Sequence, residues 1–70
     1  MDYRIKAGQV LKIEPDASGR NMVVAQVKSQ YGQVVVSLPE ERLRKDGQGG
    51  YHVRDKQART QFRSAVLEKR

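Results

Sequence analysis

The chain has 70 residues, and its 14 Lys and Arg against 8 Asp and Glu give a formal net charge of +6 at pH 7. It has no cysteine and one histidine, so disulfide bridges are excluded and a structural zinc site has too few soft ligands. A domain of this size buries only about 60% of the surface that its unfolded chain exposes, which favours self-association.

The sequence predicts a cytoplasmic protein without a membrane partner. No apolar run approaches the ~20 residues that a membrane-spanning helix needs. The opening residues MDYRIKAGQV also lack the apolar centre of a signal peptide. The absence of cysteine is typical of a reducing compartment.

The first predicted strand runs from Arg4 to Glu14. Its odd positions Ile5, Ala7, Leu11 and Ile13 are apolar, and Arg4, Lys6, Lys12 and Glu14 between them are charged. This period of two indicates a half-buried strand, which Gly8 is expected to bend near its middle. The turn formers of residues 15–21 then predict a loop.

A β-hairpin is predicted for residues 22–39, MVVAQVKSQYGQVVVSLP, with Tyr31 and Gly32 at its tip. In that register Val27 faces Val36, and one side of the hairpin is apolar. The other side carries three apolar residues, Met22, Val24 and Val35, where a solvated face should be polar. We therefore expect these three to be covered, either by the C-terminal helix or by a second copy of the protein.

The remaining elements are short until the end of the chain. After Pro39 the sequence predicts one helical turn or a bent strand with Leu43 inward, then a glycine-rich loop and a strand at residues 51–54. Asp55 is a good N-cap for a helix over residues 55–70. The expected fold is mainly β with a C-terminal helix: a small SH3-like barrel of about five strands in residues 1–54, with an OB-like barrel as the alternative. The helix either packs on this barrel or projects from it.

The C-terminal helix is predicted to be amphipathic and basic. Its buried face is formed by Ala58, Phe62, Ala65 and Val66. The cations Lys56, Arg59, Arg63 and Arg70 form a stripe in a neighbouring arc. Such a stripe either keeps a helix solvated or contacts phosphates, which suit the fork of arginine.

Further residues can extend a phosphate-binding surface. Arg54 and Arg44 lie close to the helix and the hairpin in the sequence, and Arg42 and Lys45 add to this charge. Tyr31, at the hairpin tip, either stacks on a base or folds over the hairpin.

No residue set typical of an enzyme is present. His52 has no cysteine to activate, and the serines lie in no nucleophile motif. Glu40 and Glu41 stand beside arginines and are expected to form a solvated ion-pair patch. The sequence therefore predicts a protein without catalytic activity, metal or cofactor.

Residues 6–44 resemble the KOW-type and other SH3-like modules of transcription and translation proteins. The shared pattern is a Lys-x-Gly-x-Val opening, a glycine-containing loop, a valine-rich hairpin and a Leu-x-x-Glu-x-Leu turn; Met22 stands where the pattern has its second glycine. The resemblance implies a barrel that binds nucleic acid or a nucleoprotein.

Two functions are expected from the sequence. The first is a regulator that binds DNA or RNA through the basic helix, with Lys56, Arg59, Arg63 and Arg70 as its main phosphate contacts. The alternative is a small interaction module that docks on a larger nucleoprotein complex through Met22, Val24 and Val35. Self-association is compatible with both.

Overall fold

The computed structural model describes residues 3–67. The elements, in chain order, are β1 (Arg4–Ile5), the 3-10 turn η1 (Ala7–Gln9), β2 (Val10–Pro15), β3 (Asn21–Ser29), β4 (Gly32–Pro39), the 3-10 turn η2 (Glu40–Arg42), β5 (Leu43–Lys45), β6 (Tyr51–Val53) and α1 (Lys56–Leu67). The expectation of a mainly β chain with a C-terminal helix is confirmed. After Pro39 the chain forms both structures that the sequence had left open, a 3-10 turn and then a short strand.

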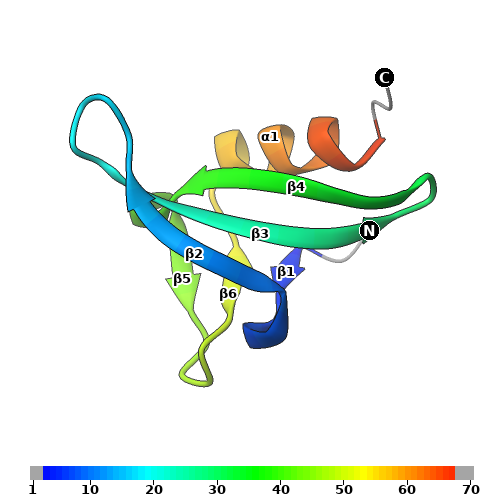
Figure 1. Cartoon of the computed structure of the whole chain (residues 1–70), viewed down its shortest axis with the longest axis horizontal. Helices are drawn as coiled ribbons and strands as arrows, with labels where there is room; N and C mark the ends of the chain where they lie inside the picture. Colours follow the sequence, from blue (N-terminus) through cyan, green and yellow to red (C-terminus); the bar gives the residue numbers. More distant parts are fainter. Residues whose placement is uncertain (1–2, 68–70) are drawn as a thin grey trace.

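The strands form two antiparallel sheets, in the orders β2-β3-β4 and β1-β6-β5. In Figure 1 the long strands of the first sheet cross in front, the second sheet lies behind them, and α1 lies along the upper side near β4. The two sheets together do not form a closed barrel within the described residues.

The prediction of a single strand from Arg4 to Glu14 is wrong, because η1 divides this segment into β1 and β2. The N–H of Gln9 donates to the carbonyl of Lys6 (2.9 Å), and the N–H of Lys6 donates to Oε1 of Gln9 (2.8 Å). This tight turn sends the two halves of the segment into different sheets. Strand β1 therefore pairs with β6 and brings Arg4 opposite His52.

The hairpin is present, but its observed register differs from the predicted one by two residues. Val27 faces Val34 instead of Val36, and the two-residue turn is Gln30–Tyr31. Gly32 follows this turn with a φ of +112°, so the glycine carries the left-handed conformation that tyrosine disfavours. Because the shift is two residues, every side chain keeps its predicted face.

The core lies between the two sheets and under the helix. Each of these three layers contributes buried side chains: Ile5, Tyr51 and Val53; Val23, Ala25, Val27, Val36 and Leu38; and Ala58, Phe62 and Val66. The helix residues are those predicted, except that Ala65 is only half-buried. No helix within residues 3–67 is long and apolar enough to cross a membrane.

The helix does not cover Met22, Val24 and Val35, which corrects one of the two predicted arrangements. Phe62 packs against the opposite face of the hairpin, with Val23 and its neighbours. Val24 is nevertheless only 8% exposed, because it lies on the central strand between Lys12 and Ser37. Val35, on the edge strand β4, is 58% exposed.

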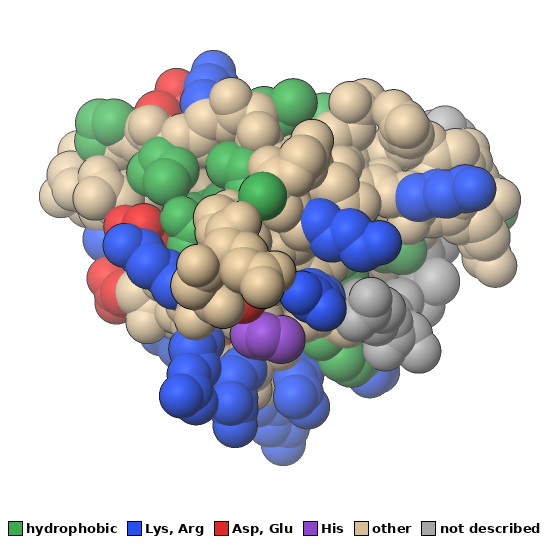
Figure 2. All heavy atoms as spheres, turned by 90° about the horizontal axis from the view of Figure 1, so that it is seen from below, with side chains coloured by type: hydrophobic (Ala, Val, Ile, Leu, Met, Phe, Trp, Pro, Cys, Tyr) green, Lys and Arg blue, Asp and Glu red, His purple; other side chains and the backbone are tan. Residues whose placement is uncertain are grey.

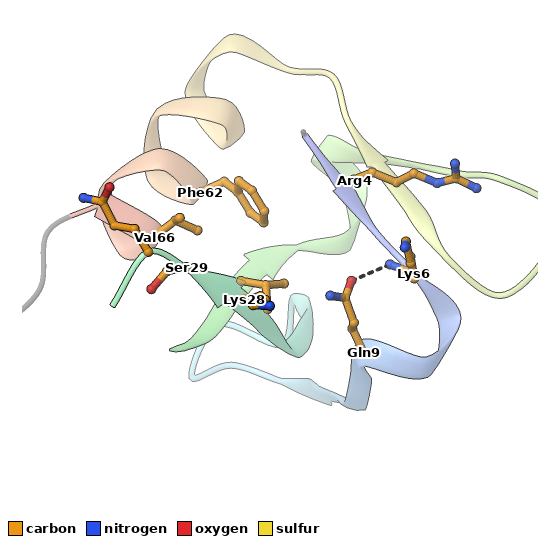
Figure 3. A pocket seen from close by; sticks show the side chains of 9 residues that line it. Arg4, Lys6, Gln9, Lys28, Ser29, Phe62 and Val66 are labelled. Atoms are coloured by element: carbon orange, nitrogen blue, oxygen red, sulfur yellow. Dashed lines mark hydrogen bonds between the residues drawn. The ribbon is translucent and has the colours of Figure 1, made fainter. Parts of the chain in front are cut away.

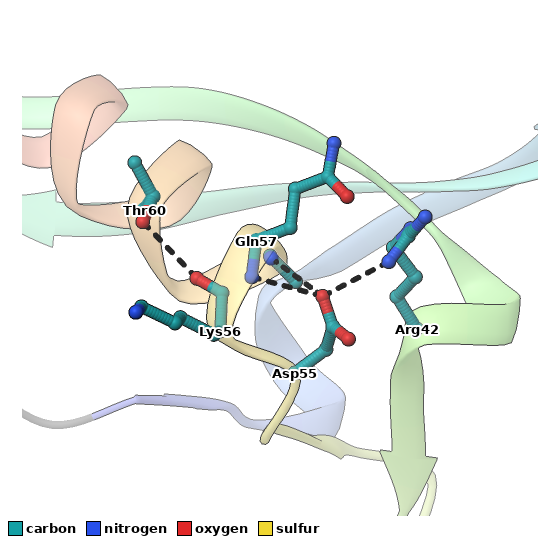
Figure 4. Close-up of polar contacts among 6 residues, drawn as sticks. Arg42, Asp55, Lys56, Gln57 and Thr60 are labelled. Carbon is teal, nitrogen blue, oxygen red and sulfur yellow. Dashed lines mark hydrogen bonds and ion pairs between the residues drawn. The ribbon is translucent and has the colours of Figure 1, made fainter.

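Asp55 caps α1 as predicted. Its Oδ2 accepts hydrogen bonds from the N–H groups of Gln57 (2.9 Å) and Ala58 (3.1 Å), and it also accepts from Nη1 of Arg42 (3.1 Å). Figure 4 shows these contacts converging on one carboxylate oxygen. The Ala58 N–H, together with the charge of Arg42, holds the pKa of Asp55 below its usual range. This carboxylate therefore joins the helix to η2.

Candidate nucleic-acid interface

A row of basic side chains crosses the outward face of the sheet β1-β6-β5. Arg4 and Arg44 are the two cross-strand partners of His52, one on each neighbouring strand. Neighbouring strands lie about 4.8 Å apart, so these side chains leave the sheet side by side. Figure 2 shows Lys and Arg side chains gathered beside the one histidine.

Asp46 is an acidic residue beside this row, and its carboxylate is held by Arg4 and by backbone N–H groups. Its side chain is only 7% exposed and forms an ion pair with Nη2 of Arg4 at 3.5 Å. Its Oδ1 accepts hydrogen bonds from the N–H groups of Gln48 (2.7 Å) and Gly50 (3.0 Å). The hydrogen bond from Gln48 is the main reason that the pKa of Asp46 is lowered. Arg44 therefore faces no exposed carboxylate in this part of the structure.

Arg54 and Arg59 connect the sheet to the helix. Arg54, just after β6, lines a shallow concavity together with Arg44, Lys45, Asp46 and His52. From α1, Nε of Arg59 donates to the carbonyl of Val53, the residue before Arg54, at 3.0 Å. This hydrogen bond places the Arg59 side chain next to the backbone of the residue that precedes Arg54.

Tyr3 fixes the two arginines of the helix. The guanidinium of Arg59 lies over its ring, 5.0 Å from the centroid, and that of Arg63 lies 6.0 Å from it. Nε and Nη2 of Arg63 also donate to the Tyr3 hydroxyl, at 3.1 Å and 2.6 Å. Tyr3 itself is half-buried and packs on Phe62, with 6.2 Å between the ring centroids. Both arginines therefore keep a defined direction while their remaining N–H groups stay exposed.

We call these six residues the basic face: Arg4, Arg44, His52, Arg54, Arg59 and Arg63. The predicted Arg44, Arg54, Arg59 and Arg63 belong to it. Lys56 is exposed at the start of α1, beside Arg42 and Asp55. Arg70 lies outside the described residues.

Tyr31 does not join the basic face. It occupies the hairpin tip, at the end of the molecule away from β5 (Figure 1). Its side chain is 50% exposed, and its N–H donates to Oγ of Ser29 at 3.0 Å. If Tyr31 contacts a ligand, it does so separately from Arg44.

A cleft of about 370 Å³ opens between β1, the end of β3 and α1. Three cations (Arg4, Lys6 and Lys28), three polar residues (Gln9, Ser29 and Gln30) and three apolar residues (Val27, Phe62 and Val66) line it. Figure 3 shows the Phe62 ring directed toward this space, while the Arg4 side chain extends away from it. Since Phe62 is buried, the cleft offers a cationic rim but no exposed aromatic platform.

The arrangement is suited to binding anions. Arginine guanidinium groups that are spaced along a sheet and a helix can each engage a phosphate oxygen through charge-assisted hydrogen bonds. Within residues 3–67, no three His, Asp or Glu side chains lie close enough together to hold a metal ion. His52 has Arg4 and Arg44 as its cross-strand neighbours, and Asp46 lines the same concavity.

Three residues of this site were not predicted from the sequence: Arg4 and His52, which belong to the basic face, and Tyr3, which orients its helix arginines. Arg4 and His52 each alternate with buried neighbours, so their outward direction was readable, but the pairing of β1 with β6 was not. Tyr3 stands before the first apolar alternation and carries no pattern of its own.

No family model, no curated protein and no solved structure matches this chain.

Proposed function

We propose that this protein is a non-enzymatic nucleic-acid-binding protein whose basic face contacts the phosphate backbone. The observation that carries the proposal is the alignment of Arg4, His52 and Arg44 in one cross-strand row, continued through Arg54 to the helix. A net charge of +6 adds long-range attraction for a polyanion.

The binding mechanism follows from the charge and its placement. Arg59 and Arg63 are held against Tyr3, so less side-chain entropy is lost when they engage a phosphate. Each phosphate that is neutralised releases condensed counterions, which makes the affinity fall steeply with salt. Contacts of this kind position a protein on the backbone without reading the bases, so weak sequence preference is expected.

The proposed fold type is an SH3-like barrel of the KOW-like kind. Two features support it: the antiparallel meander β2-β3-β4, and the 3-10 turn η2 that leads directly into the short strand β5. A small barrel is compatible with the proposed function, since partly open barrels of the OB type bind oligonucleotides through a strand face and the adjoining loops.

The test is a binding titration with Arg44→Ala and Arg54→Ala in one chain. Within residues 3–67 these two side chains form no hydrogen bond or ion pair, so the variant should fold like the wild type. Fluorescence anisotropy with labelled duplex DNA, duplex RNA and single strands is measured over a series of salt concentrations. The slope of log affinity against log salt should become shallower by about two, one for each lost phosphate contact.

A matched control removes the same charge elsewhere. Arg20→Ala with Lys28→Ala takes one cation from the loop before β3 and one from the end of β3; neither belongs to the basic face, although Lys28 shares a cleft with Arg4. This variant should keep the wild-type slope more closely than Arg44→Ala with Arg54→Ala. Equal slopes for the two double variants would mean that the net charge alone, and not the basic face, is responsible.

A second candidate function is docking on a larger nucleoprotein complex. The observation in its favour is the exposure of Val35 on the outer face of β3 and β4. The contribution of Val24 is small, because that side chain is buried between its neighbours. Val35→Lys should abolish capture of a purified candidate partner after nuclease treatment, whereas direct nucleic-acid binding should not depend on Val35.

A further inference from the structure

Strand β2 has a free edge with exposed apolar side chains. It pairs with β3 on one side, and within residues 3–67 no strand pairs with its other side. Leu11 is 55% exposed and Ile13 46% exposed, the highest values for large apolar residues besides Tyr31 and Val35. A free edge of this kind is a template for another strand.

The backbone of Ile13 points to this free edge. The N–H of Asp16 donates to the carbonyl of Arg20 at 2.8 Å, so Asp16 bonds toward β3. Antiparallel ladders alternate, and Glu14 and Lys12 therefore also bond toward β3, while Ile13 directs its N–H and C=O outward. Pro15 occupies a position whose N–H would point outward, which is where a strand tolerates proline.

The sequence of β2 is complementary to itself in the antiparallel direction. With Ile13 on a two-fold axis, Lys12 of one copy faces Glu14 of the other, and Glu14 faces Lys12. Leu11 then comes opposite Pro15, but β2 is irregular at Leu11, so the regular two-fold ladder covers Lys12, Ile13 and Glu14. One register thus places opposite charges together and apolar residues together, so both kinds of contact agree.

We propose that the protein forms a two-fold dimer through antiparallel pairing of β2 with β2 of a second copy. The two sheets β2-β3-β4 then join into one continuous sheet, and the exposed side chains of Leu11 and Ile13 lie at the interface. Lys12 and Glu14, whose side chains now form an ion pair at 3.3 Å on the strand surface, exchange partners across the axis. The two identical contacts form an isologous interface.

The other sheet edges are less suited to a second copy. The edge strand β4 has α1 packed against it. Strand β5 carries Arg44 and Lys45, so pairing with itself would bring like charges together. Strand β1 has two residues, Arg4 and Ile5.

Charge reversal tests both the edge and the register. Lys12→Glu places two glutamates against two glutamates across the axis, and Glu14→Lys does the same with lysines. Each single variant should dimerise about tenfold more weakly than the wild type, because two attractive cross-strand pairs become two repulsive ones. An equimolar mixture of the two variants should recover association, since every facing pair then has opposite charges.

The measurement is sedimentation equilibrium of the full chain over a series of concentrations. The wild type should rise from 8.0 kDa toward twice that mass. A wild type that stays monomeric overturns the proposal, and so does a mixture that associates no better than its components. Both reversed side chains are more than half exposed, so circular dichroism should show native folding in each variant.

An independent test uses the absence of cysteine from the chain. Ile13→Cys places two thiols on the two-fold axis, where paired strands approach closely enough for a disulfide. Under mild oxidation this variant should form a covalent dimer faster than Gln33→Cys, an exposed position on β4. Equal rates for the two variants would overturn the proposal. Neither test uses a nucleic acid, so a failure of the dimer proposal can be distinguished from a failure of the proposed function.

Discussion

Tyr3 supports the basic face through its ring and through its hydroxyl, and the two contributions are separable. Tyr3→Phe keeps the ring under Arg59 and against Phe62 but removes the acceptor of Arg63. We expect a loss of stability of about 1 kcal/mol, the usual net value of one hydrogen bond, and a weaker affinity for polyanions because Arg63 is no longer oriented. Denaturant unfolding and an anisotropy titration measure the two effects.

The matched control is Tyr31→Phe. Within the described part of the chain the Tyr31 hydroxyl forms no hydrogen bond, although the residue type and the lost atom are the same. Its stability should equal that of the wild type. If Tyr3→Phe behaved like this control in both measurements, the hydroxyl contact to Arg63 would have no energetic role.

Asp55 makes the stability of the protein depend on pH in the acid range. Its pKa is lower in the folded chain than in the unfolded chain, chiefly because of the Ala58 N–H. The stabilisation is therefore complete above the unfolded value of about 3.9 and is lost as the pH falls toward the folded value. In Asp55→Asn the cap is kept but the titrating group is absent, so its melting temperature should fall less steeply below that pH.

Thermal melts of the two proteins from neutral to acid pH measure this difference. Asp16 and Asp46 also have lowered pKa values, mainly through hydrogen bonds from Ser18 and from the Gln48 N–H, so part of the acid loss should remain in the variant. Identical acid profiles would show that the Asp55 carboxylate contributes nothing beyond what asparagine supplies.

At the scale of elements, α1 is held by one large side chain. Phe62 is the only phenylalanine of the chain and lies in the core with Ala58 and Val66. Phe62→Ala should destabilise the protein by about 3–5 kcal/mol, a large part of the stability expected for a domain of this size. Because the helix packs on its own chain, the loss should appear as a lower melting temperature that does not depend on concentration in the monomer range.

Ala65→Gly is the matched control on the same helix. Ala65 is only half-buried, so the change should cost about 1 kcal/mol from helix propensity alone. A Phe62→Ala variant that melted like this control would contradict the packing of α1 on the two sheets.

Local rules predicted the elements better than their pairing. The faces of the hairpin were readable because alternation survives a shift of two residues, and the helix start was readable because Asp55 is a capping residue. The register of the hairpin could not be read from the sequence. It depends on where the residue with a positive φ lies, and in the structure this residue, Gly32, follows the turn instead of forming part of it. The alternation from Arg4 to Glu14 gave no indication of η1. This turn depends on the Gln9 side chain, which accepts a hydrogen bond from the N–H of Lys6.

At the scale of the whole molecule, the candidate interface depended on contacts that no segment reveals. The sequence pointed to a stripe on the helix, and Arg59 and Arg63 do flank Tyr3 there. The cross-strand row required knowing that β1 leaves its neighbour β2 and pairs with β6 near the other end of the chain. Pairing between distant strands is decided by the packing of the whole core and not by local pattern, which is why Arg4 and His52 were missed.

The pairing of β1 with β6 also sets when the basic face can exist during folding. Arg44 is close to His52 in the sequence, but Arg4 precedes it by 48 residues, so the loop that brings Arg4 to the row encloses about two thirds of the chain. Closing a loop of that length has the largest entropic cost, and it is repaid only when the core between the sheets is present. A chain still emerging from a ribosome, or a fragment ending before β6, therefore carries the cations without their alignment. The aligned row of Arg4, His52 and Arg44 therefore forms only once the two sheets have folded.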